Sequence, residues 1–150
     1  MAASTFQLAQ LNVARLSAAL DSPELADFVA GLEPVNALAD AAPGFVWRLQ
    51  EASGDATGLR PWGDDMIVNL SVWASIEELR AYVFAPGHVE VLRRRREWFV
   101  PMDTPHLVLW WVPAGHRPSL VEAGERLTGL AADGPNPAAF TLRTAFPAPA

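Results

Sequence analysis

The stretch from residue 69 to residue 99 constrains the fold of this chain more than any other, because its apolar pattern changes from the period of a strand to that of a helix. Its first five residues alternate, so Leu70 and Val72 point to one side of a strand while Asn69 and Trp73 point to the other. A Ser-x-x-Glu capping box follows, then a helical pattern, a Pro-Gly pair and a second helical pattern. The stretch therefore predicts a strand followed directly by two helices.

His88 is the sharpest candidate for chemistry in this stretch. Pro86 and Gly87 end the first helix, because Pro lacks an N–H group and Gly permits positive φ, and His88 then falls at the start of the second helix. The positive end of the helix dipole disfavours an imidazolium, so we expect a largely neutral ring. A neutral ring can accept a proton or bind a metal, and it can equally cap or pack against a helix start. The sequence leaves both roles open.

The remaining strands are bounded by turn residues and carry apolar residues on both faces. The four predicted strands cover residues 6–13, 45–50, 66–73 and 107–112. A helix that begins within residues 21–24 and continues toward Ala41 separates the first two strands, and we expect Pro34 to kink or split it. The resulting order, β-α-β-β-α-β, predicts an α+β, ferredoxin-like antiparallel sheet with both helices on one face.

Two helices on one side leave the other face of such a sheet without a cover. On the third strand, Met66, Val68, Leu70 and Val72 form an entirely apolar face. A patch of this size is uncommon on a soluble monomer, and a second copy packing sheet to sheet would bury it. The sequence therefore predicts a homodimer, with the core of each copy at about residues 6–112.

Two segments lie outside the strands and helices of this core. Residues 52–65 are rich in Gly, Asp and turn residues, and we interpret them as a long, mobile hairpin loop with the features of a lid. Residues 113–150 form an extension in which we predict a helix over residues 119–132 and a short strand over residues 139–146. No linker or repeat divides the chain, so residues 1–150 are predicted to form a single domain.

The composition argues against several classes of function. The net charge of −6 disfavours a nucleic-acid-binding face, and the arginines from Arg93 to Arg96 spread around a helix instead of forming a stripe. The absence of cysteine removes disulfides and thiolate metal sites. No acids or histidines have metal-ligand spacing, and no phosphate loop or serine-nucleophile motif occurs. The N-terminus resembles neither a signal peptide nor a membrane span, so we expect a cytoplasmic protein without a membrane partner.

The layout resembles the dimeric α/β-barrel superfamily, which contains antibiotic-biosynthesis monooxygenases and haem-degrading monooxygenases. A third strand ending in Trp73, a capped helix and the break at Ala85-Pro86-Gly87-His88 carry this resemblance over residues 6–112. The chain also resembles one branch of this superfamily more closely, over nearly its whole length. That branch has an uncharacterised function, so the closer resemblance implies no reaction. It rests on the phrases LAQLNVARL, PGFVWRLQ, NLSVW, RRRREWF and VLWWVPAGHRP.

The resemblance implies a ligand between the sheet and its own helices. Cofactor-free, quinone-forming monooxygenases of the superfamily use an Asn and a Trp four apart on a strand, a spacing that Asn69 and Trp73 share. Haem-degrading members use an Asn on the first strand, a Trp on the third and a His on the next helix, roles that Asn12, Trp73 and His88 would fill. This chain departs from both patterns, because a longer insertion separates Trp73 from His88.

Two arginines on apolar faces need partners. Arg95 follows His88 by one heptad on the same helix face. A structural carboxylate such as Glu51 or Asp65 would satisfy it, and so would an anionic substrate. Arg48 raises the same question on the second strand.

These residues lead to one main hypothesis and two alternatives. The main hypothesis is an enzyme that binds a small aromatic or polyketide-like substrate in a Trp-lined pocket and oxygenates it without a bound cofactor, or isomerises or cyclises it. His88 would act as base, Asn69 and Trp73 would position the substrate, and Arg95 would stabilise a developing enolate or phenolate. The residues predicted to complete the pocket are Asn12, Trp47, Arg48, Trp98 and Trp110. The alternatives are a haem protein with His88 as axial ligand and a non-catalytic carrier or sensor of small molecules.

Overall fold

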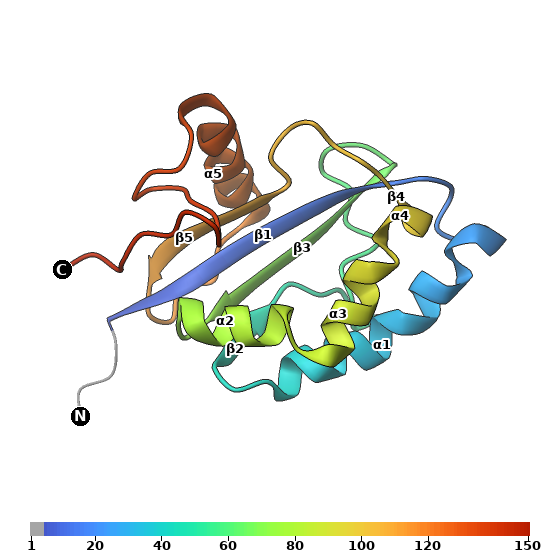
Figure 1. Ribbon diagram of the computed structural model, residues 1–150, viewed down its shortest axis with the longest axis horizontal. Coiled ribbons are helices and arrows are strands. Elements are labelled where there is room, and N and C mark those ends of the chain that lie inside the picture. Colours follow the sequence, from blue (N-terminus) through green and yellow to red (C-terminus); the bar gives the residue numbers. More distant parts are fainter. Residues whose placement is uncertain (1–4) are drawn as a thin grey trace.

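The computed structural model describes residues 5–150, and a five-stranded antiparallel sheet forms its centre (Figure 1). The strands are β1 (Phe6–Leu16), β2 (Phe45–Arg48), β3 (Met66–Trp73), β4 (Phe99–Val100) and β5 (Leu107–Pro113). They run in the spatial order β2-β3-β1, and β4 and β5 both pair with the other side of β1. This is the predicted α+β, ferredoxin-like arrangement, and it is confirmed.

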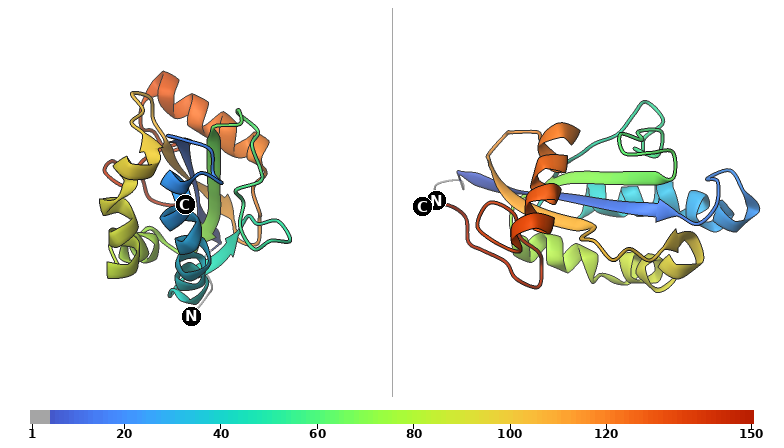
Figure 2. Two further views of the ribbon diagram at one scale, coloured as in Figure 1. Left: turned by 90° about the vertical axis from the view of Figure 1, so that its right-hand side faces the viewer. Right: turned by 90° about the horizontal axis from the view of Figure 1, so that it is seen from above.

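Helices cover both faces of this sheet. The helical segments are a 3₁₀ turn (Pro23–Leu25), α1 (Ala26–Ala41), α2 (Ile76–Val83), α3 (Pro86–Arg93), α4 (Arg95–Trp98) and α5 (Leu120–Asp133). The segments α2, α3 and α4 lie on one side of the sheet, and α5 packs with the loop between β2 and β3 on the other side (Figure 2). We call these sides the helix-layer face and the α5 face.

Side-chain caps start two of the helices. Ser75 Oγ accepts a hydrogen bond from the backbone N–H of Glu78 at 3.2 Å, and Ser119 Oγ accepts one from Glu122 at 3.1 Å. The serine of each Ser-x-x-Glu pattern, Ser75 and Ser119, therefore caps its helix as predicted. The Glu122 carboxylate bonds to Trp110 and His116. Pro34 lies inside α1 without splitting it, so of the two predicted effects the split does not occur and the kink stays a prediction.

The predicted second helix, from residue 88 to residue 99, is divided in two. The chain leaves helical geometry at Arg94, where φ is −96° and ψ is 3°, and α4 follows as a single turn. Phe99 and Val100 then pair with the end of β1 as a short strand. Tertiary pairing with the sheet thus ends the helix that the sequence pattern would extend.

The C-terminal extension covers the sheet face that we expected to be exposed. Ala123 and Leu130 of α5 pack against the core of the α5 face. That core is buried within one chain and consists of Ala9, Leu11, Val13, Met66, Val68, Leu70, Val72, Val108, Trp110 and Val112, with exposed fractions of 0 to 8%. Full burial of each Val, Leu or Met side chain in this set is worth about 1.5–3 kcal/mol. The exposed patch from which we argued for a homodimer is therefore absent among the described residues, and the homodimer stays a prediction.

The predicted strand over residues 139–146 does not form. Phe140 makes a single bridge with Leu109 of β5, through hydrogen bonds of 2.8 and 2.9 Å. The chain then bends, because the backbone N–H of Thr144 donates to the Thr141 hydroxyl at 3.0 Å. Phe140 is fully buried, and Leu142 and Phe146 pack against the same cluster. Trp111 Nε1 of β5 also donates to the carbonyl of Phe146 at 2.9 Å, so several contacts hold this segment to the sheet.

Candidate functional site

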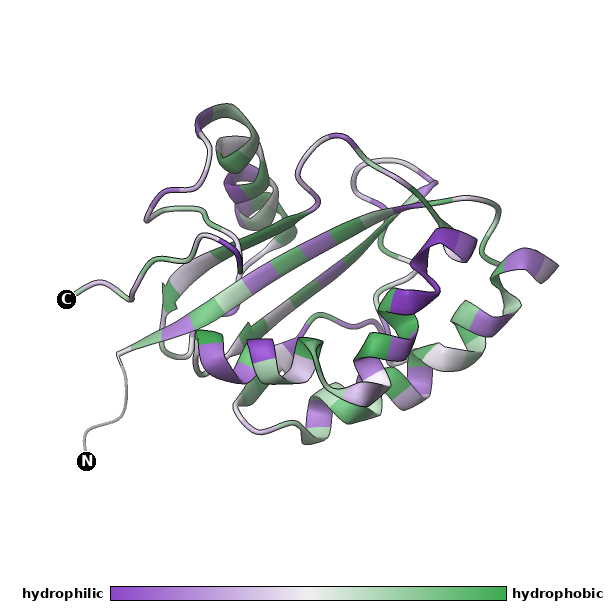
Figure 3. Cartoon of the chain, in the orientation of Figure 1, coloured by the Kyte–Doolittle hydropathy of each residue, from purple (hydrophilic) through white to green (hydrophobic). Residues whose placement is uncertain are grey.

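The central strands β1 and β3 carry polar side chains on the helix-layer face. Their register places Gln10 opposite Ser71 and Asn12 opposite Asn69. Figure 3 shows hydrophilic bands alternating with hydrophobic ones along the central strands. Asn12 and Asn69 are exposed although both strands lie inside the sheet, whereas Gln10 and Ser71 are buried. We call these four residues the polar floor.

Two apolar clusters flank the polar floor. The Trp73 cluster contains Leu8, Trp73, Leu79, Leu109 and Phe140, and the Trp98 cluster contains Leu16, Leu25, Ile67 and Trp98. Both clusters join the sheet to the helix layer. Between them the sheet presents amide groups to solvent, which gives the helix-layer face a polar centre with an apolar surface at each end.

Hydrogen bonds connect the polar floor to Trp73. Gln10 Nε2 donates to Asn69 Oδ1 at 2.6 Å and to Ser71 Oγ at 2.8 Å, and Trp73 Nε1 donates to the same hydroxyl at 2.9 Å. Asn69 and Trp73, which the sequence predicts as a functional pair, are thus linked through two residues that the sequence analysis missed. Because Asn69 Oδ1 already accepts a hydrogen bond, its NH₂ group is the part of the amide left for a ligand.

Tyr82 lies between Trp73 and His88. Its ring centroid is 5.1 Å from that of Trp73 and 5.0 Å from that of His88. Its hydroxyl donates to the backbone carbonyl of Val35 at 3.3 Å, which fastens α2 to α1. Burial raises the pKa of Tyr82 to about 12, so the phenol stays protonated as a donor at neutral pH.

His88 has a defined tautomer. Its Nδ1 lies 3.0 Å from the backbone carbonyl oxygen of Val83, and a carbonyl can only accept, so Nδ1 carries the proton and Nε2 keeps its lone pair. Burial lowers the pKa of His88, and the hydrogen bond to Val83 opposes this shift only in part. The ring is therefore neutral at pH 7, as predicted, although the main cause is burial and we had inferred it from the helix dipole.

The structure does not bring the two predicted arginines to the polar floor. Arg95 is exposed, and its Nη1 donates to the carbonyl of Leu92 at 3.2 Å without a carboxylate partner. The suggested partner Asp65 contacts Arg15 instead. Our prediction that Arg95 faces the pocket with His88 is wrong, because the helix breaks at residue 94 and turns the side chain outward.

Arg48 has a structural environment. Its guanidinium donates to both carboxylate oxygens of Asp40, at 2.8 and 3.3 Å, and to the carbonyl of Gly54 at 2.6 Å. The Arg48 side chain is only 11% exposed, and it joins the end of α1 to the loop after β2. Its charge is therefore already satisfied within the chain.

The predicted Trp-lined pocket is divided between the two faces of the sheet. A bulge between Phe45 and Trp47 places Phe45 with the Trp73 cluster but turns Trp47 to the α5 face. Trp110 also lies in the α5 face, where Nε1 donates to Glu122 Oε2 at 2.9 Å. Trp98 is on the helix-layer face, but it packs against Phe28 with ring centroids 5.4 Å apart. The four predicted tryptophans therefore do not line one pocket.

Partial signals for the residues that we missed are present in the sequence. Gln10 alternates with Asn12 on the first strand, and Ser71 lies between Asn69 and Trp73 on the third. That spacing places each pair on one face, but it does not reveal which residues of the two strands lie opposite each other. Tyr82 belongs to the apolar stripe of its helix, and nothing in the sequence distinguishes it from a core residue.

No group of three or more His, Cys, Asp or Glu side chains gathers as a metal ion would require among residues 5–150. Within the same range, no helix combines the length and the apolar character needed to cross a bilayer. His88 Nε2 is the histidine nitrogen of the helix-layer face that could contact a cofactor, because Nδ1 is already bonded to Val83.

A family model described as a domain of unknown function, DUF3291, matches residues 7–150. The chain belongs to the DUF3291 family. Among curated proteins, none matches this DUF3291 chain.

Solved structures share the fold of this DUF3291 domain. PA3566 from Pseudomonas aeruginosa is 9% identical, with 77% of this chain and 100% of that chain covered and a TM-score of 0.51. SnoaB from Streptomyces nogalater, a cofactor-independent oxygenase, is 20% identical over 76% of this chain and 96% of its own, with a TM-score of 0.46. A dabb family protein with a ferredoxin-like fold from Mesorhizobium loti is 19% identical over 73% and 99%, with a TM-score of 0.45. The predicted resemblance is confirmed at the level of fold.

Proposed function

We propose that this chain is an enzyme that oxygenates a small, electron-rich aromatic substrate held over the polar floor, without a bound cofactor. The observation that carries the proposal is the exposure of Asn12 and Asn69 between two buried apolar clusters on the helix-layer face. A ligand with an apolar ring and oxygen substituents complements such a surface, because the ring meets the apolar ends and the oxygens meet the amides.

The polar floor favours negative charge that develops on a substrate oxygen. The Asn69 NH₂ group is free to donate, and Gln10 fixes the Asn69 side chain through the 2.6 Å hydrogen bond. Held donors of this kind stabilise an oxyanion without reorganising during the reaction. Trp73 is 1% exposed, so we assign it a positioning role that acts through Ser71.

His88 is the base in this proposal. A substrate hydroxyl would lose its proton to Nε2, and the resulting anion would transfer one electron to dioxygen. The substrate radical and superoxide then combine in a carbon–oxygen bond, and the peroxide anion takes back the proton held on Nε2. Loss of water from the resulting C–H hydroperoxide leaves the quinone carbonyl. The lowered pKa of His88 keeps Nε2 available as an acceptor at neutral pH. Arg95 has no part in this scheme, because its guanidinium lies at the surface.

Oxygen consumption with a hydroxyanthrone tests the proposal. We expect turnover by the purified protein, with the quinone product followed by its absorbance. Asn69→Ala should lower kcat about 10²-fold, the magnitude typical of a lost oxyanion donor. The matched control is Asn36→Ala on α1, because Asn36 lies outside the polar floor and its side chain makes no hydrogen bond to any residue from 5 to 150.

Two outcomes would contradict the proposal. Equal activity of the Asn69→Ala and Asn36→Ala variants would remove the polar floor from the reaction. Saturable binding of hydroxyaromatic compounds without oxygen uptake, unchanged in His88→Gln, would identify a carrier instead of an enzyme.

Haem binding is a second candidate function, favoured by the hydrogen bond from His88 Nδ1 to a backbone carbonyl, which is how metal-binding histidines are commonly oriented. The surroundings do not fit a haem between Trp73 and His88, because Tyr82 contacts both rings and fills that space. In a haem titration we expect the wild-type protein and His88→Ala to give the same spectra, without a Soret shift that depends on His88. A saturable shift that depends on His88 would show that the chain binds haem.

A further inference from the structure

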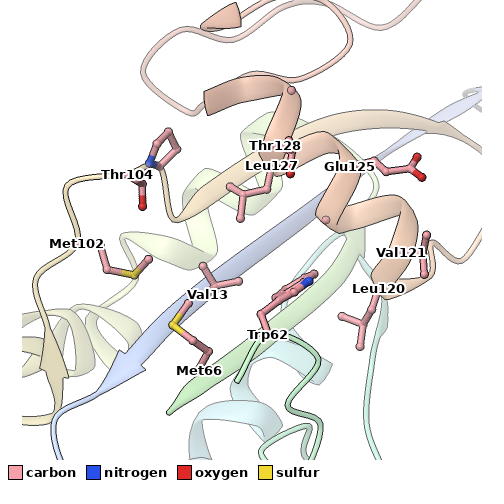
Figure 4. Close-up of a pocket in the computed structure, with 13 residues that line it drawn as sticks. Val13, Trp62, Met66, Met102, Thr104, Leu120, Val121, Glu125, Leu127 and Thr128 are labelled. Atoms are coloured by element: carbon pink, nitrogen blue, oxygen red, sulfur yellow. The ribbon is translucent and has the colours of Figure 1, made fainter. Parts of the chain in front are cut away.

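A groove of about 760 Å³ lies on the α5 face, on the opposite side of the sheet from the polar floor (Figure 4). Val13 of β1 and Met66 of β3 form its base, and Leu127 of α5 lies above them. Met102, from the connection between β4 and β5, and Trp62, from the loop before β3, enclose it from two further sides. Val13 lies next to Asn12 in β1 but points to the other face, so the groove and the polar floor are separate.

The chemistry of this groove is almost entirely apolar. Its only charged lining residue is Glu125, and the hydroxyls of Thr104 and Thr128 are its other polar side-chain groups apart from the Trp62 indole. Two methionines, Met66 and Met102, give it an adaptable surface, because the thioether chain has many low-energy conformations. A carboxylate in the lining and a net charge of −6 both disfavour anions.

Gly124 gives Trp62 its place beside α5. A Cβ atom built at position 124 would lie 2.8 Å from Cζ2 of Trp62, closer than side chains normally approach. Glycine inside a helix costs about 1 kcal/mol relative to alanine, and here it allows the indole to lie directly on the helix. Trp62 remains 40% exposed and its Nε1 makes no hydrogen bond within residues 5–150, so the ring presents a large surface that a ligand can use.

The loop that we predicted as a lid belongs to this groove. Ala56 and Leu59 anchor it in the core of the α5 face, and Trp62 follows at the groove itself. The backbone N–H of Met66 closes the loop by donating to the carbonyl of Gly63 at 3.1 Å. The loop therefore contacts a site on the α5 face and leaves the polar floor uncovered.

We propose that this groove is a second small-molecule site, which takes an uncharged, mainly apolar ligand packed between Trp62 and Leu127. Its volume lies within the range of about 300–1,000 Å³ that small-molecule sites occupy. The buried base formed by the sheet makes it concave, and its lack of cations disfavours acidic ligands. This site is independent of the proposed oxygenase, because none of its lining residues belongs to the polar floor.

Titration with Nile red, an uncharged apolar dye, tests this site in the full chain. We expect a saturable rise in dye fluorescence, weakened at least tenfold by Trp62→Ala. Thr128→Arg should weaken it similarly by placing charge and volume in the groove, and it serves as a second variant if Trp62→Ala fails to fold. The control on the same helix is Ala131→Arg, which is exposed and does not line the groove.

Two measurements distinguish dye binding in the groove from binding at the polar floor and from use of the groove as a dimer interface. Dye binding should be unchanged in Asn69→Ala, and a selective loss in that variant would overturn the proposal. Dye binding that is equal in Thr128→Arg and Ala131→Arg would also overturn it. Light scattering gives the third criterion: a dimer that Thr128→Arg dissociates would show that a second copy occupies the groove, and an unchanged mass supports a small-molecule site.

Discussion

The two faces of β1 and β3 differ in polarity, although they are formed by alternating residues of the same two strands. On the α5 face, Leu11 and Leu70 oppose each other and are 0% and 1% exposed. On the helix-layer face, the next pair along the strands is Asn12 and Asn69, and both side chains are exposed. One face holds a continuous apolar core and the other has a polar centre. Neighbouring residues of one strand therefore contribute to different properties, one to stability and the next to ligand chemistry.

The source of this separation is the C-terminal extension. Because α5 and the loop between β2 and β3 bury the core of this face within one chain, the sheet obtains an apolar core on one side without help from the helix layer. The helix layer can then leave part of its own face uncovered. Substitutions on the two faces should therefore have opposite consequences for stability and for function.

The largest effect is expected from neighbouring substitutions on β3. Leu70→Ala should lower the free energy of unfolding by about 2–5 kcal/mol, because it leaves a cavity in the α5-face core. Asn69→Ala should change it by only about 0.5 kcal/mol while turnover falls. Urea unfolding at pH 7 measures both. A loss of stability in Asn69→Ala equal to that in Leu70→Ala would break the distinction between the faces.

A smaller effect is expected at the link between Asn69 and Trp73. Gln10→Leu removes hydrogen bonds to Asn69 and Ser71, and it should cost about 1–2 kcal/mol. It should also lower kcat more than it changes KM, because Asn69 loses its fixed orientation. Gln50→Leu is the matched control, since Gln50 is exposed and its side chain makes no hydrogen bond in the part of the chain that the structure describes. Identical kinetics of the two variants would argue against a positioning role for Gln10.

On the α5 face, Glu122 contributes to the free energy of unfolding in a pH-dependent way. Burial raises its pKa, but hydrogen bonds from His116 and Trp110 together with nearby positive charge outweigh burial, and the net pKa lies below the ordinary value of 4.5. The stabilisation is thus present above pH 4.5 and is lost as the pH falls through the folded-state pKa. Glu122→Gln should cost about 1 kcal/mol at pH 7 and little in acid. Urea unfolding at several pH values measures this, and the control on the same helix is Glu125→Gln, which breaks no ion pair within residues 5–150.

On the helix-layer face, His88 should have the smallest effect on stability. Because burial lowers its folded-state pKa below 6.5, its contribution is present above pH 6.5 and is lost as the pH falls through the folded value. His88→Gln should therefore make the free energy of unfolding less sensitive to acid. An NMR titration of the ring protons tests the direction of the shift, with His106→Gln to assign the resonances. A His88 pKa above 6.5 would contradict the buried, neutral ring.

Local patterns in the sequence were sufficient for the main elements of the fold. Alternation along β3 placed Asn69 and Trp73 on one face, and the boxes at Ser75 and Ser119 marked the starts of α2 and α5. These signals depend on contacts within a few residues, which is why they could be interpreted without the rest of the chain.

Features that depend on distant residues could not be predicted. The bulge that turns Trp47 to the α5 face depends on how β2 pairs with β3. The bond from Gln10 to Ser71 needs the register of two strands that are far apart in sequence. The position of α5 decides whether one sheet face is open, and its amphipathic pattern fits packing on its own sheet or on a second copy equally well.

The bridge between Phe140 and Leu109 also limits how the sheet can grow. Both backbone groups of Leu109 are bonded to Phe140, in the middle of a strand that would otherwise present free N–H and C=O groups at an edge. Another chain adding to β5 would have to displace a fully buried aromatic ring before it could pair. At the opposite edge, β2 is only four residues long and bulged. Both edges thus resist the strand-to-strand association that leads to aggregation.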